Sequence, residues 1–192
     1  MAVLILAVLA LSACSSEIAP SQTPSNQALA GFPQSDMSGY AGLEGYEKEL
    51  VFVDVTMEDV DALMKNQETF TLYAGFSNCP WCNSLISYLN DVALEQGEKI
   101  AYLDTRRDPS WQSNLDLEGY DTFVEYFGEY LEIDGDGKPH LYVPDVYFIK
   151  DGQVVDRHEG VVPGLGSPSD PITDELLETL TSTLEEKFGK LQ

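Results

Sequence analysis

The sequence predicts an α/β fold, with a central mixed sheet flanked by helices, and three observations lead to this prediction. Apolar segments with strand composition alternate with amphipathic helical segments along residues 50–188. Cys79 and Cys82 stand where an apolar strand at 69–76 gives way to a helix, and α/β proteins place their chemistry at such strand ends. Asp151-Gly152 predicts a hairpin turn near the end of the chain, which makes the sheet mixed.

The composition fits one domain with a tail. The chain has 192 residues, 43% of them hydrophobic, which is enough for one packed core but tight for two. Its formal charge is -23, from 33 acidic and 10 basic side chains. Such a chain repels phosphates, so nucleic acid is not an expected partner. Most of the acid is interpreted as a solvated, soluble surface.

Residues 1–14 are predicted to be a signal segment. Residues 2–11 form an apolar run too short to span a bilayer comfortably, and polar residues soon follow. The run ends in Leu11-Ser12-Ala13-Cys14, which resembles the lipobox of bacterial lipoproteins. That resemblance implies that Cys14 receives lipid and anchors the protein on the extracytoplasmic face of the cell membrane. The alternative is a buried N-terminal strand that contains a cysteine by chance.

Residues 15–48 are predicted to be a flexible tether. They are rich in Ser, Pro, Gln, Gly and Ala, and such a segment buries too little apolar surface to offset its chain entropy. About thirty residues of this kind reach about 30 Å, which would let the domain sample the space above the membrane. Tyr40 and Tyr46 are expected to lie where the tether meets the domain.

The domain itself is predicted at 49–190, and it begins with a strand and a helix. Residues 50–55 are β-branched and aromatic enough for a strand. Thr56 and Asp59 have the spacing of a capping box, which opens a helix to about residue 66.

The helix that carries the cysteines has clear ends. Pro80 suits the first helical position, where a missing N–H has no effect, so Cys79 is expected to cap the helix. Apolar residues at three-to-four spacing continue it to about Gln96, and Gly97 ends it. A third strand is predicted at 100–104.

Residues 106–140 are predicted to be a helical insertion before the next strand. Aromatic residues predict a helix at 121–131, and they are interpreted as core, with a substrate groove beside the cysteines as the alternative. The Asp134–Gly137 run suggests a calcium loop, but Lys138 and Pro139 occupy the positions that need a ligand and a glycine. A tight turn is therefore the preferred interpretation.

The last part of the domain predicts a hairpin and a closing helix. A strand at 141–150 contains Pro144, which argues against an ordinary central strand. A strand at 153–156 follows the turn, and an amphipathic helix at 173–188 ends at Gly189.

The spacing of the two cysteines places both sulfurs on one face of the helix, close enough to form and break a disulfide. Free backbone N–H groups and the helix dipole favour a thiolate at Cys79, which we therefore expect to be the nucleophile. Cys82, a turn further in, is expected to be the resolving thiol. Trp81 offers an apolar surface beside the sulfur for a partner chain.

Two other interpretations of the pair remain. It could be half of a zinc site, but structural zinc needs four ligands and the two His are remote in sequence. It could also be a purely structural disulfide. No metal and no organic cofactor is expected.

The order of elements, the Cys-Pro-Trp-Cys motif at a helix start, and Val143-Pro144 before an Asp-Gly hairpin resemble the thioredoxin-like superfamily over residues 50–188. The resemblance implies that Pro144 has a cis peptide bond and lies against the cysteines. It also implies that Val143 and Pro144 form the surface that binds the substrate chain. With Pro80 and Trp81 of the motif, they are the predicted substrate-binding residues. More narrowly, the sequence resembles thioredoxin-like lipoproteins and bacteriocin transport accessory proteins of Gram-positive bacteria.

The sequence departs from thioredoxin at two places. Thioredoxin has a buried acid six residues before its first cysteine, where this chain has Tyr73, and a Gly-Pro dipeptide where this chain has Pro-Trp. Both changes leave the direction of electron flow open, because they tune the reduction potential. His158 and Asp156 are candidate proton donors, with an ordinary surface position as the alternative.

These observations predict a membrane-anchored, extracytoplasmic thiol-disulfide oxidoreductase. It would exchange disulfides in exported cysteine-containing proteins or peptides through Cys79 and Cys82, and a membrane redox partner would regenerate it. The alternative is a non-enzymatic accessory protein that binds an exported peptide or a transporter.

Overall fold

A five-stranded mixed sheet lies at the centre of the computed structural model, which describes residues 24–108, 110 and 112–192. Its strand order is β1-β3-β2-β6-β7. The first three strands in that order are parallel, and the other two are antiparallel to their neighbours. Their bounds are β1 Phe52–Asp54, β3 Ile100–Asp104, β2 Phe70–Gly75, β6 Asp145–Lys150 and β7 Gln153–Glu159.

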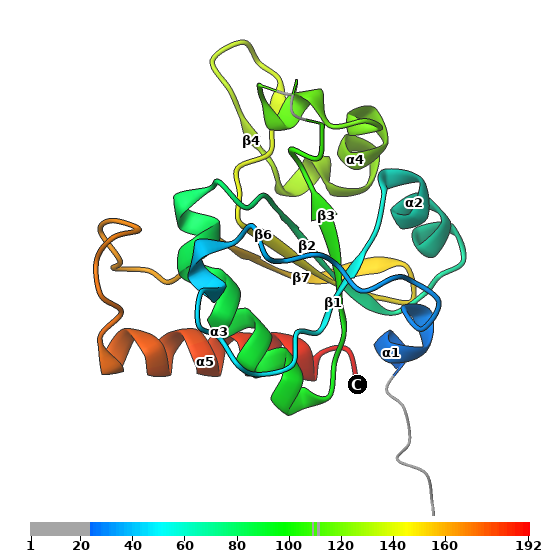
Figure 1. Ribbon diagram of the computed structural model, residues 1–192. Coiled ribbons are helices and arrows are strands. Elements are labelled where there is room, and N and C mark those ends of the chain that lie inside the picture. The colour runs from blue at the N-terminus through cyan, green and yellow to red at the C-terminus, as the bar shows by residue number, and fades with distance from the viewer. Residues whose placement is uncertain (1–23, 109, 111) are drawn as a thin grey trace, which may run out of the picture.

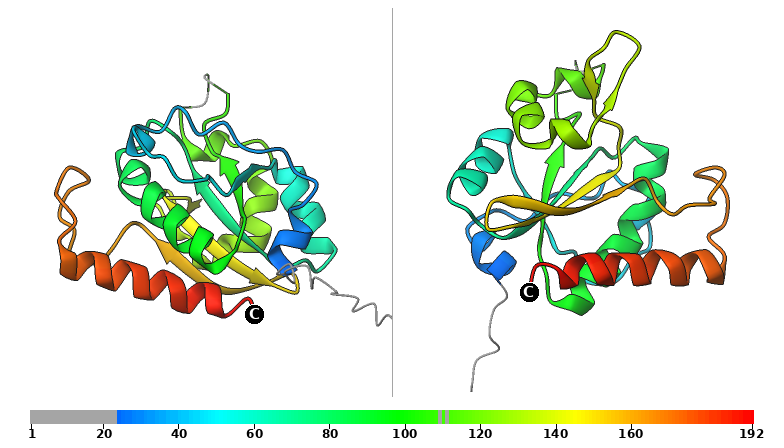
Figure 2. Two further views of the ribbon diagram at one scale, coloured as in Figure 1. Left: turned by 60° about the horizontal axis from the view of Figure 1, so that its bottom comes forward. Right: turned by 180° about the vertical axis from the view of Figure 1, so that it is seen from behind.

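Two helices cover each face of the sheet (Figures 1 and 2). Helices α3 (Pro80–Gln96) and α5 (Asp174–Gly189) pack on one face, and α2 (Met57–Lys65) and α4 (Tyr120–Phe127) on the other. A separate hydrophobic cluster fills the space under each pair. This is the predicted α/β architecture, a central mixed sheet flanked by helices, with the cysteines at the start of α3.

Local sequence signals account for the helix ends. The Thr56 hydroxyl accepts the Asp59 N–H, and the Asp59 carboxylate accepts the Thr56 N–H, so the predicted capping box starts α2. Helix α3 begins at Pro80 and is capped after Gln96 by Gly97, whose φ of 69° suits glycine. The predicted start of α3 and the predicted bounds of β3 are confirmed.

The N-terminal segment corrects one prediction. From Pro24 the chain is not a free tether but packs along β1, where the Ser35 N–H donates to the Phe52 carbonyl (3.0 Å) and the Asp54 N–H to the Pro33 carbonyl (2.8 Å). An open sheet edge offers unpaired backbone groups, so a polar segment can be held with few apolar side chains. The buried apolar side chains are Leu29, Met37 and Tyr40.

Two N-terminal predictions cannot be compared with the fold. The signal segment, with Cys14, and the part of the tether before residue 24 lie outside the described residues. Within the described residues, the segment contains helix α1 (Pro24–Ala28) and a 3-10 turn, η1 (Ala41–Leu43).

The insertion at 106–140 contains helix, as predicted, but most of its residues lie in turns, loops and a short hairpin. The helix predicted at 121–131 is divided into α4 and the 3-10 turn η3 (Gly128–Tyr130), after an earlier turn, η2 (Asn114–Asp116). A short hairpin follows, β4 (Glu132–Ile133) and β5 (Pro139–His140). The Asp134 carboxylate closes that hairpin by accepting two backbone N–H groups, so the tight-turn interpretation is confirmed.

The start of β6 differs from the prediction. The strand begins at Asp145 and not at residue 141, because Pro144 has no N–H to donate to a ladder. The hairpin turn is as predicted, with positive φ at both Asp151 (51°) and Gly152 (71°). Helix α5 is capped by Thr173 and includes Gly189, the residue predicted to end it.

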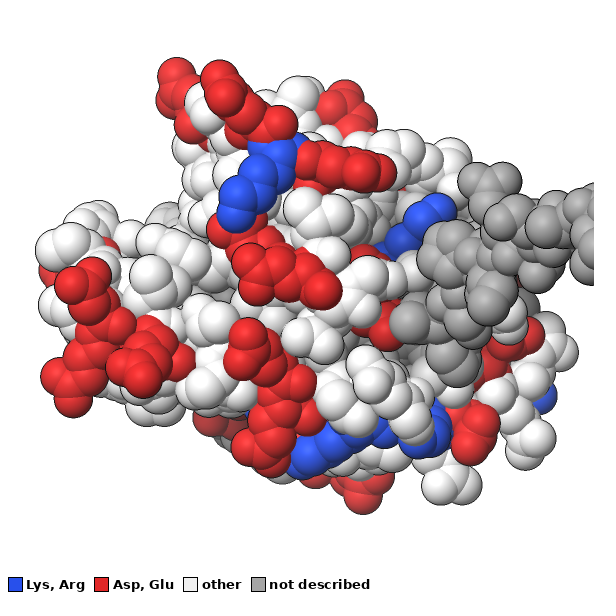
Figure 3. All heavy atoms as spheres, turned by 90° about the horizontal axis from the view of Figure 1, so that it is seen from below, with Lys and Arg blue, Asp and Glu red and all other residues white. Residues whose placement is uncertain are grey.

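Much of the acidic excess lies on the surface of the protein. Figure 3 shows acidic side chains spread over the face that includes α5, with few basic ones among them.

No helix in the described ranges is long and apolar enough to cross a membrane.

Candidate functional site

The two cysteines occupy different positions at the start of α3. Cys79 is the N-cap residue, and its sulfur accepts the backbone N–H of Cys82 (3.2 Å). Its thiol also points at the Val143 carbonyl oxygen (3.6 Å). Cys79 keeps 5% of its surface exposed, whereas Cys82 has none. Cys79 is therefore the sulfur that another molecule can reach.

The two thiols also differ in acidity. The pKa of Cys79 is lowered, first by the hydrogen bond from the Cys82 thiol and then by the N–H groups of Cys82 and Trp81 and by the charge of Arg106, against an opposing effect of burial. Burial raises the pKa of Cys82 far above its ordinary value, and Cys79 raises it further. Cys79 therefore ionises first.

The residues predicted to bind substrate meet at this point. The Val143-Pro144 peptide bond is cis, and the Val143 carbonyl faces Cys79. Val143 and Trp81 are half-buried and pack on the same hydrophobic cluster, while Pro80 is exposed. Tyr142, next to Val143 in the chain, is 46% exposed, and its ring lies tilted against that of His140, with 4.4 Å between ring centroids.

Asn83 is a structural residue of the site that sequence reasoning missed. Its side chain donates to the carbonyls of Ser77 (2.6 Å) and Cys79 (2.9 Å) and accepts the Gly42 N–H (2.8 Å). A Cβ at Gly42 would lie only 2.1 Å from the Asn83 carbonyl oxygen, so glycine is required there. The N-terminal segment is thus fastened to the turn that presents Cys79.

Arg106 was also missed. Its guanidinium lies 5.0 Å from the centroid of the Phe76 ring, three residues before Cys79, and its Nε donates to Asn114 (3.1 Å). The available signal was its place just after the strand at 100–104, because neighbouring parallel strands end at the same edge of a sheet.

His158 and Asp156, the candidate proton donors, have other partners. The His158 Nε2 bonds to the Val161 carbonyl (2.8 Å), and burial lowers the pKa of this imidazole. Asp156 pairs with Lys187 (2.6 Å) and Lys190 of the C-terminal helix region. These contacts support a structural role for both residues.

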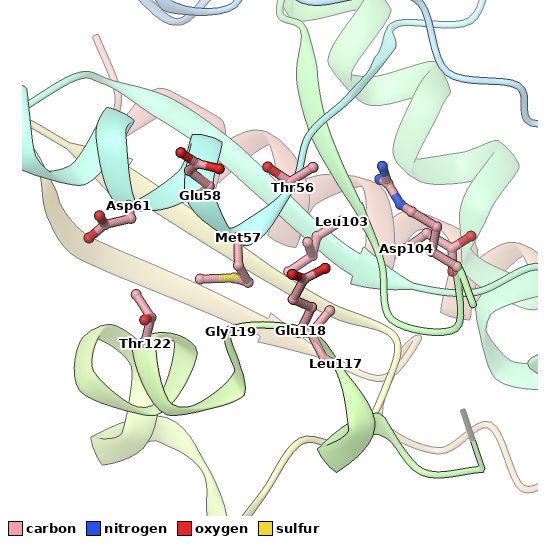
Figure 4. Close-up of a pocket in the computed structure, with 11 residues that line it drawn as sticks. Thr56, Met57, Glu58, Asp61, Leu103, Asp104, Leu117, Glu118, Gly119 and Thr122 are labelled. Atoms are coloured by element: carbon pink, nitrogen blue, oxygen red, sulfur yellow. The ribbon is translucent and has the colours of Figure 1, made fainter. Parts of the chain in front are cut away.

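A separate cleft of about 400 Å³ lies between the start of α2 and the insertion (Figure 4). Met57, Leu103 and Leu117 give it an apolar lining, and Glu58, Asp61 and Glu118 add acidic groups. Neither cysteine lines it. In the described part of the chain, no three His, Cys, Asp or Glu side chains gather as a metal site.

No protein-family model matches the sequence, and a search of curated proteins finds no match. Among solved structures, one named "A putative oxidoreductase with a thioredoxin fold" is similar, with a TM-score of 0.47 and 10% sequence identity, over 71% of this chain and 93% of that chain.

Proposed function

We propose that this protein is a thiol-disulfide oxidoreductase with Cys79 as nucleophile and Cys82 as resolving thiol. The observation that carries the proposal is the difference between the two sulfurs. One sits at a helix N-terminus with a lowered pKa, and the other is buried beside it with a raised pKa. A structural disulfide needs no such difference, whereas stepwise exchange does.

In the first step, the Cys79 thiolate attacks one sulfur of a substrate disulfide. That S–S bond breaks, a Cys79–substrate disulfide forms, and the released substrate sulfur takes a proton. In the second step Cys82 loses its proton and attacks the Cys79 sulfur, which frees the other substrate sulfur. The substrate gains two electrons, and the enzyme holds a Cys79–Cys82 disulfide until a membrane redox partner reduces it. The reverse sequence would oxidise a substrate dithiol.

The surface around Cys79, formed by Val143, Trp81 and Tyr142, suits an extended cysteine-containing chain. The Val143 backbone faces Cys79, and the apolar surfaces of Trp81 and Tyr142 lie near the ends of the two segments that meet there. Backbone groups recognise a peptide without regard to its side chains, and apolar neighbours add contact area. We propose exported proteins or peptides with disulfides as substrates.

Single-cysteine variants test the function. Cys82→Ser should accumulate a mixed disulfide between Cys79 and a disulfide peptide, detectable by mass spectrometry, because no thiol resolves it. Cys79→Ser should form none and should not reduce insulin. Equal insulin reduction by wild type and Cys79→Ser would refute the proposal.

The Cys79→Ser variant also distinguishes the oxidoreductase from the alternative, a non-enzymatic accessory protein. A non-enzymatic accessory protein would bind an exported peptide or a transporter through the exposed Tyr142 and the half-buried Trp81. Such a protein would keep its affinity for its partner in Cys79→Ser, while thiol exchange would be absent from the wild type as well.

The site of action is a further part of the proposal. The Leu11–Cys14 motif supports a lipid anchor at Cys14 and a position on the extracytoplasmic face of the membrane. The full-length precursor expressed in a bacterium with lipoprotein processing should therefore fractionate with membranes, and Cys14→Ala should not. A Cys14→Ala variant that remains fully membrane-bound would contradict the anchor.

A further inference from the structure

Asn83, in the first turn of α3, joins the N-terminal segment to the turn before the helix. Its Nδ2 donates to the carbonyls of Ser77 (2.6 Å) and Cys79 (2.9 Å), and its Oδ1 accepts the Gly42 N–H (2.8 Å). An amide has two N–H donors and one oxygen, so each of these groups has a partner. A reversed amide would place its oxygen against two carbonyls, so the surroundings fix which way the side chain lies. We call these three hydrogen bonds the Gly42–Asn83 contact.

Two glycines of the N-terminal segment lie against the same turn. A Cβ at Gly42 would lie 2.1 Å from the Asn83 carbonyl oxygen, and a Cβ at Gly39 would lie 3.1 Å from the Ser77 side chain. Neither glycine has a positive φ, so the need for glycine comes from close approach and not from backbone conformation. The atom that a Cβ at Gly42 would meet belongs to the backbone of α3 and cannot rotate away. A larger residue at Gly42 would therefore push the segment off Asn83.

The N-terminal segment is fixed on both sides of this contact. Before it, Met37 and Tyr40 are buried in the core. After it, the Asn90 side chain forms hydrogen bonds of 2.9 and 3.0 Å with backbone groups at residues 49 and 51. Asn90 stands seven residues after Asn83, about two turns of helix, so both side chains meet the segment on one side of α3. The segment is thus a fixed support for the Gly42–Asn83 contact.

The turn that Asn83 holds decides where the Cys79 sulfur lies. The Cys79 N–H donates to the Phe76 carbonyl (3.1 Å), and the Cys79 sulfur accepts the Cys82 N–H (3.2 Å). The Cys79 carbonyl accepts both the backbone and the side-chain N–H of Asn83, at 3.1 and 2.9 Å. A thiolate gains from the N–H groups of a helix start only when its sulfur faces them, because hydrogen bonds weaken steeply when misaligned. The orientation of the backbone at Cys79 therefore controls how well its thiolate is stabilised.

We propose that the Gly42–Asn83 contact positions the Cys79 sulfur at the N-terminus of α3, and that the N-terminal segment is therefore a functional part of the redox site. Asn83 is a positioning residue, because it acts through the backbone of Ser77 and Cys79. The proposal rests on the proposed function, which it deepens by naming what fixes the geometry of the nucleophile.

The test measures the acidity of Cys79 in a Cys82→Ser background. Alkylation by iodoacetamide is followed against pH by mass spectrometry of the peptide that contains Cys79, which keeps Cys14 out of the measurement. Asn83→Ala should move the rate profile to higher pH by about half to one pH unit, the effect of about one lost hydrogen bond. The rate should fall about 3- to 10-fold below the pKa of Cys79 and should match the parent where Cys79 is fully ionised.

Other charges do not account for such a change. Cys82 and Arg106 are the titratable and charged side chains that act most strongly on Cys79. The Cys82 thiol is absent from this background, and Arg106 is not part of the Gly42–Asn83 contact. A profile that moves in Asn83→Ala therefore reports on the position of the Cys79 sulfur.

Gly42→Ala tests the contact from its other side. It should move the profile in the same direction as Asn83→Ala, and it also tests the proposal if Asn83→Ala fails to fold. Gly31→Ala is the matched control, because Gly31 lies in the same segment and no atom lies within 4 Å of a Cβ built there. Its profile should stay at that of the parent. Unmoved profiles in both Asn83→Ala and Gly42→Ala would overturn the proposal.

Asn90→Ala separates positioning from stability. It also removes hydrogen bonds between α3 and the N-terminal segment, but about two turns away from the start of the helix. It should lower the free energy of unfolding, as Asn83→Ala does, and leave the Cys79 profile in place. Equal shifts of the profile in Asn83→Ala and Asn90→Ala would overturn the positioning role.

The proposal can fail separately from the oxidoreductase function. Alkylation of Cys79 needs no disulfide substrate and no second thiol. A wild-type protein that does not reduce insulin would refute the oxidoreductase function, and the alkylation profiles would still decide the role of the Gly42–Asn83 contact.

Discussion

The two faces of the sheet bury polar groups in opposite ways. On the α4 side, Asp145 is fully buried and receives two hydrogen bonds from Arg157, at 2.8 and 2.9 Å, and one from Tyr147. On the α3 side, the buried groups near the cysteines are thiols and tyrosine hydroxyls, and Asn90 of α3 adds a buried neutral amide.

The difference shows what each face can do. The buried Asp145 carboxylate is paired with Arg157 through two hydrogen bonds. Arg157 also donates to the Tyr130 carbonyl and so links the insertion to the sheet. The α3 face holds donors with no permanent anion among them. We interpret the Asp145–Arg157 pair as a structural ion pair. We interpret the neutral groups of the α3 face as suited to a charge that appears only during a reaction.

Removing the Asp145 carboxylate should have the largest effect on the free energy of unfolding. Asp145→Ala leaves Arg157 at its half-buried place without its main partner, which typically costs about 3–5 kcal/mol of unfolding free energy. Urea unfolding followed by circular dichroism would measure it. The matched control is Lys65→Ala, which breaks the exposed pair with Asp61 and should cost about 0.5 kcal/mol or less. Similar losses in the two variants would contradict the comparison.

Titration of the Asp145 carboxyl should have a smaller effect on the free energy of unfolding. Burial raises the pKa of Asp145 to about 6, although Arg157 opposes the shift. A carboxyl with a raised folded-state pKa contributes stability that is complete below its unfolded pKa, about 4, and that is lost as the pH rises through about 6. The difference in unfolding free energy between wild type and Asp145→Asn should therefore shift in favour of wild type by at most about 3 kcal/mol as the pH falls across this window. A difference that is constant from pH 4 to 7 would contradict the raised pKa.

Sequence patterns predicted the elements of this fold well, because their signals are local. The cap at Cys79, Pro80 at the first helical position and Gly97 at the end lie within one helix and mark both ends of α3. The packing of the N-terminal segment was not predictable in this way. Its anchors, Leu29, Met37 and Tyr40, are isolated in a polar stretch, and composition cannot reveal that β1 has an open edge beside them.

The site was predictable only in part, for the same reason. The cysteine motif and Val143-Pro144 are visible as short patterns, although the contact between them spans 64 residues. Tyr40 and Tyr73 are 33 residues apart, and no periodicity links two hydroxyls in different elements. In the sequence, Tyr73 is distinguished only as a departure from thioredoxin, because its hydrogen-bond partner Tyr40 lies in another segment.

The smallest expected effect concerns Arg106, a fixed charge that acts on Cys79. Arg106 lies over the Phe76 ring and is one of the weaker causes that lower the pKa of Cys79. Arg106→Gln should raise the pKa of Cys79 and therefore reduce its thiolate fraction at neutral pH. Because a pair of partly exposed charges is worth about 1 kcal/mol or less, the iodoacetamide rate in a Cys82→Ser background should fall by about fivefold at most.

The pH profile of that reaction separates charge from packing. Arg106→Gln and the parent should converge at high pH, where Cys79 is fully ionised in both. Arg106→Lys keeps the charge and should stay close to the parent. Arg107→Gln is the matched control, because Arg107 is occupied with Asp54 (2.9 Å) and should leave the rate unchanged. Equal losses in Arg106→Gln and Arg107→Gln would mean that general charge, and not the position over Phe76, tunes Cys79. The α3 face would then depend on its neutral donors and its helix terminus alone.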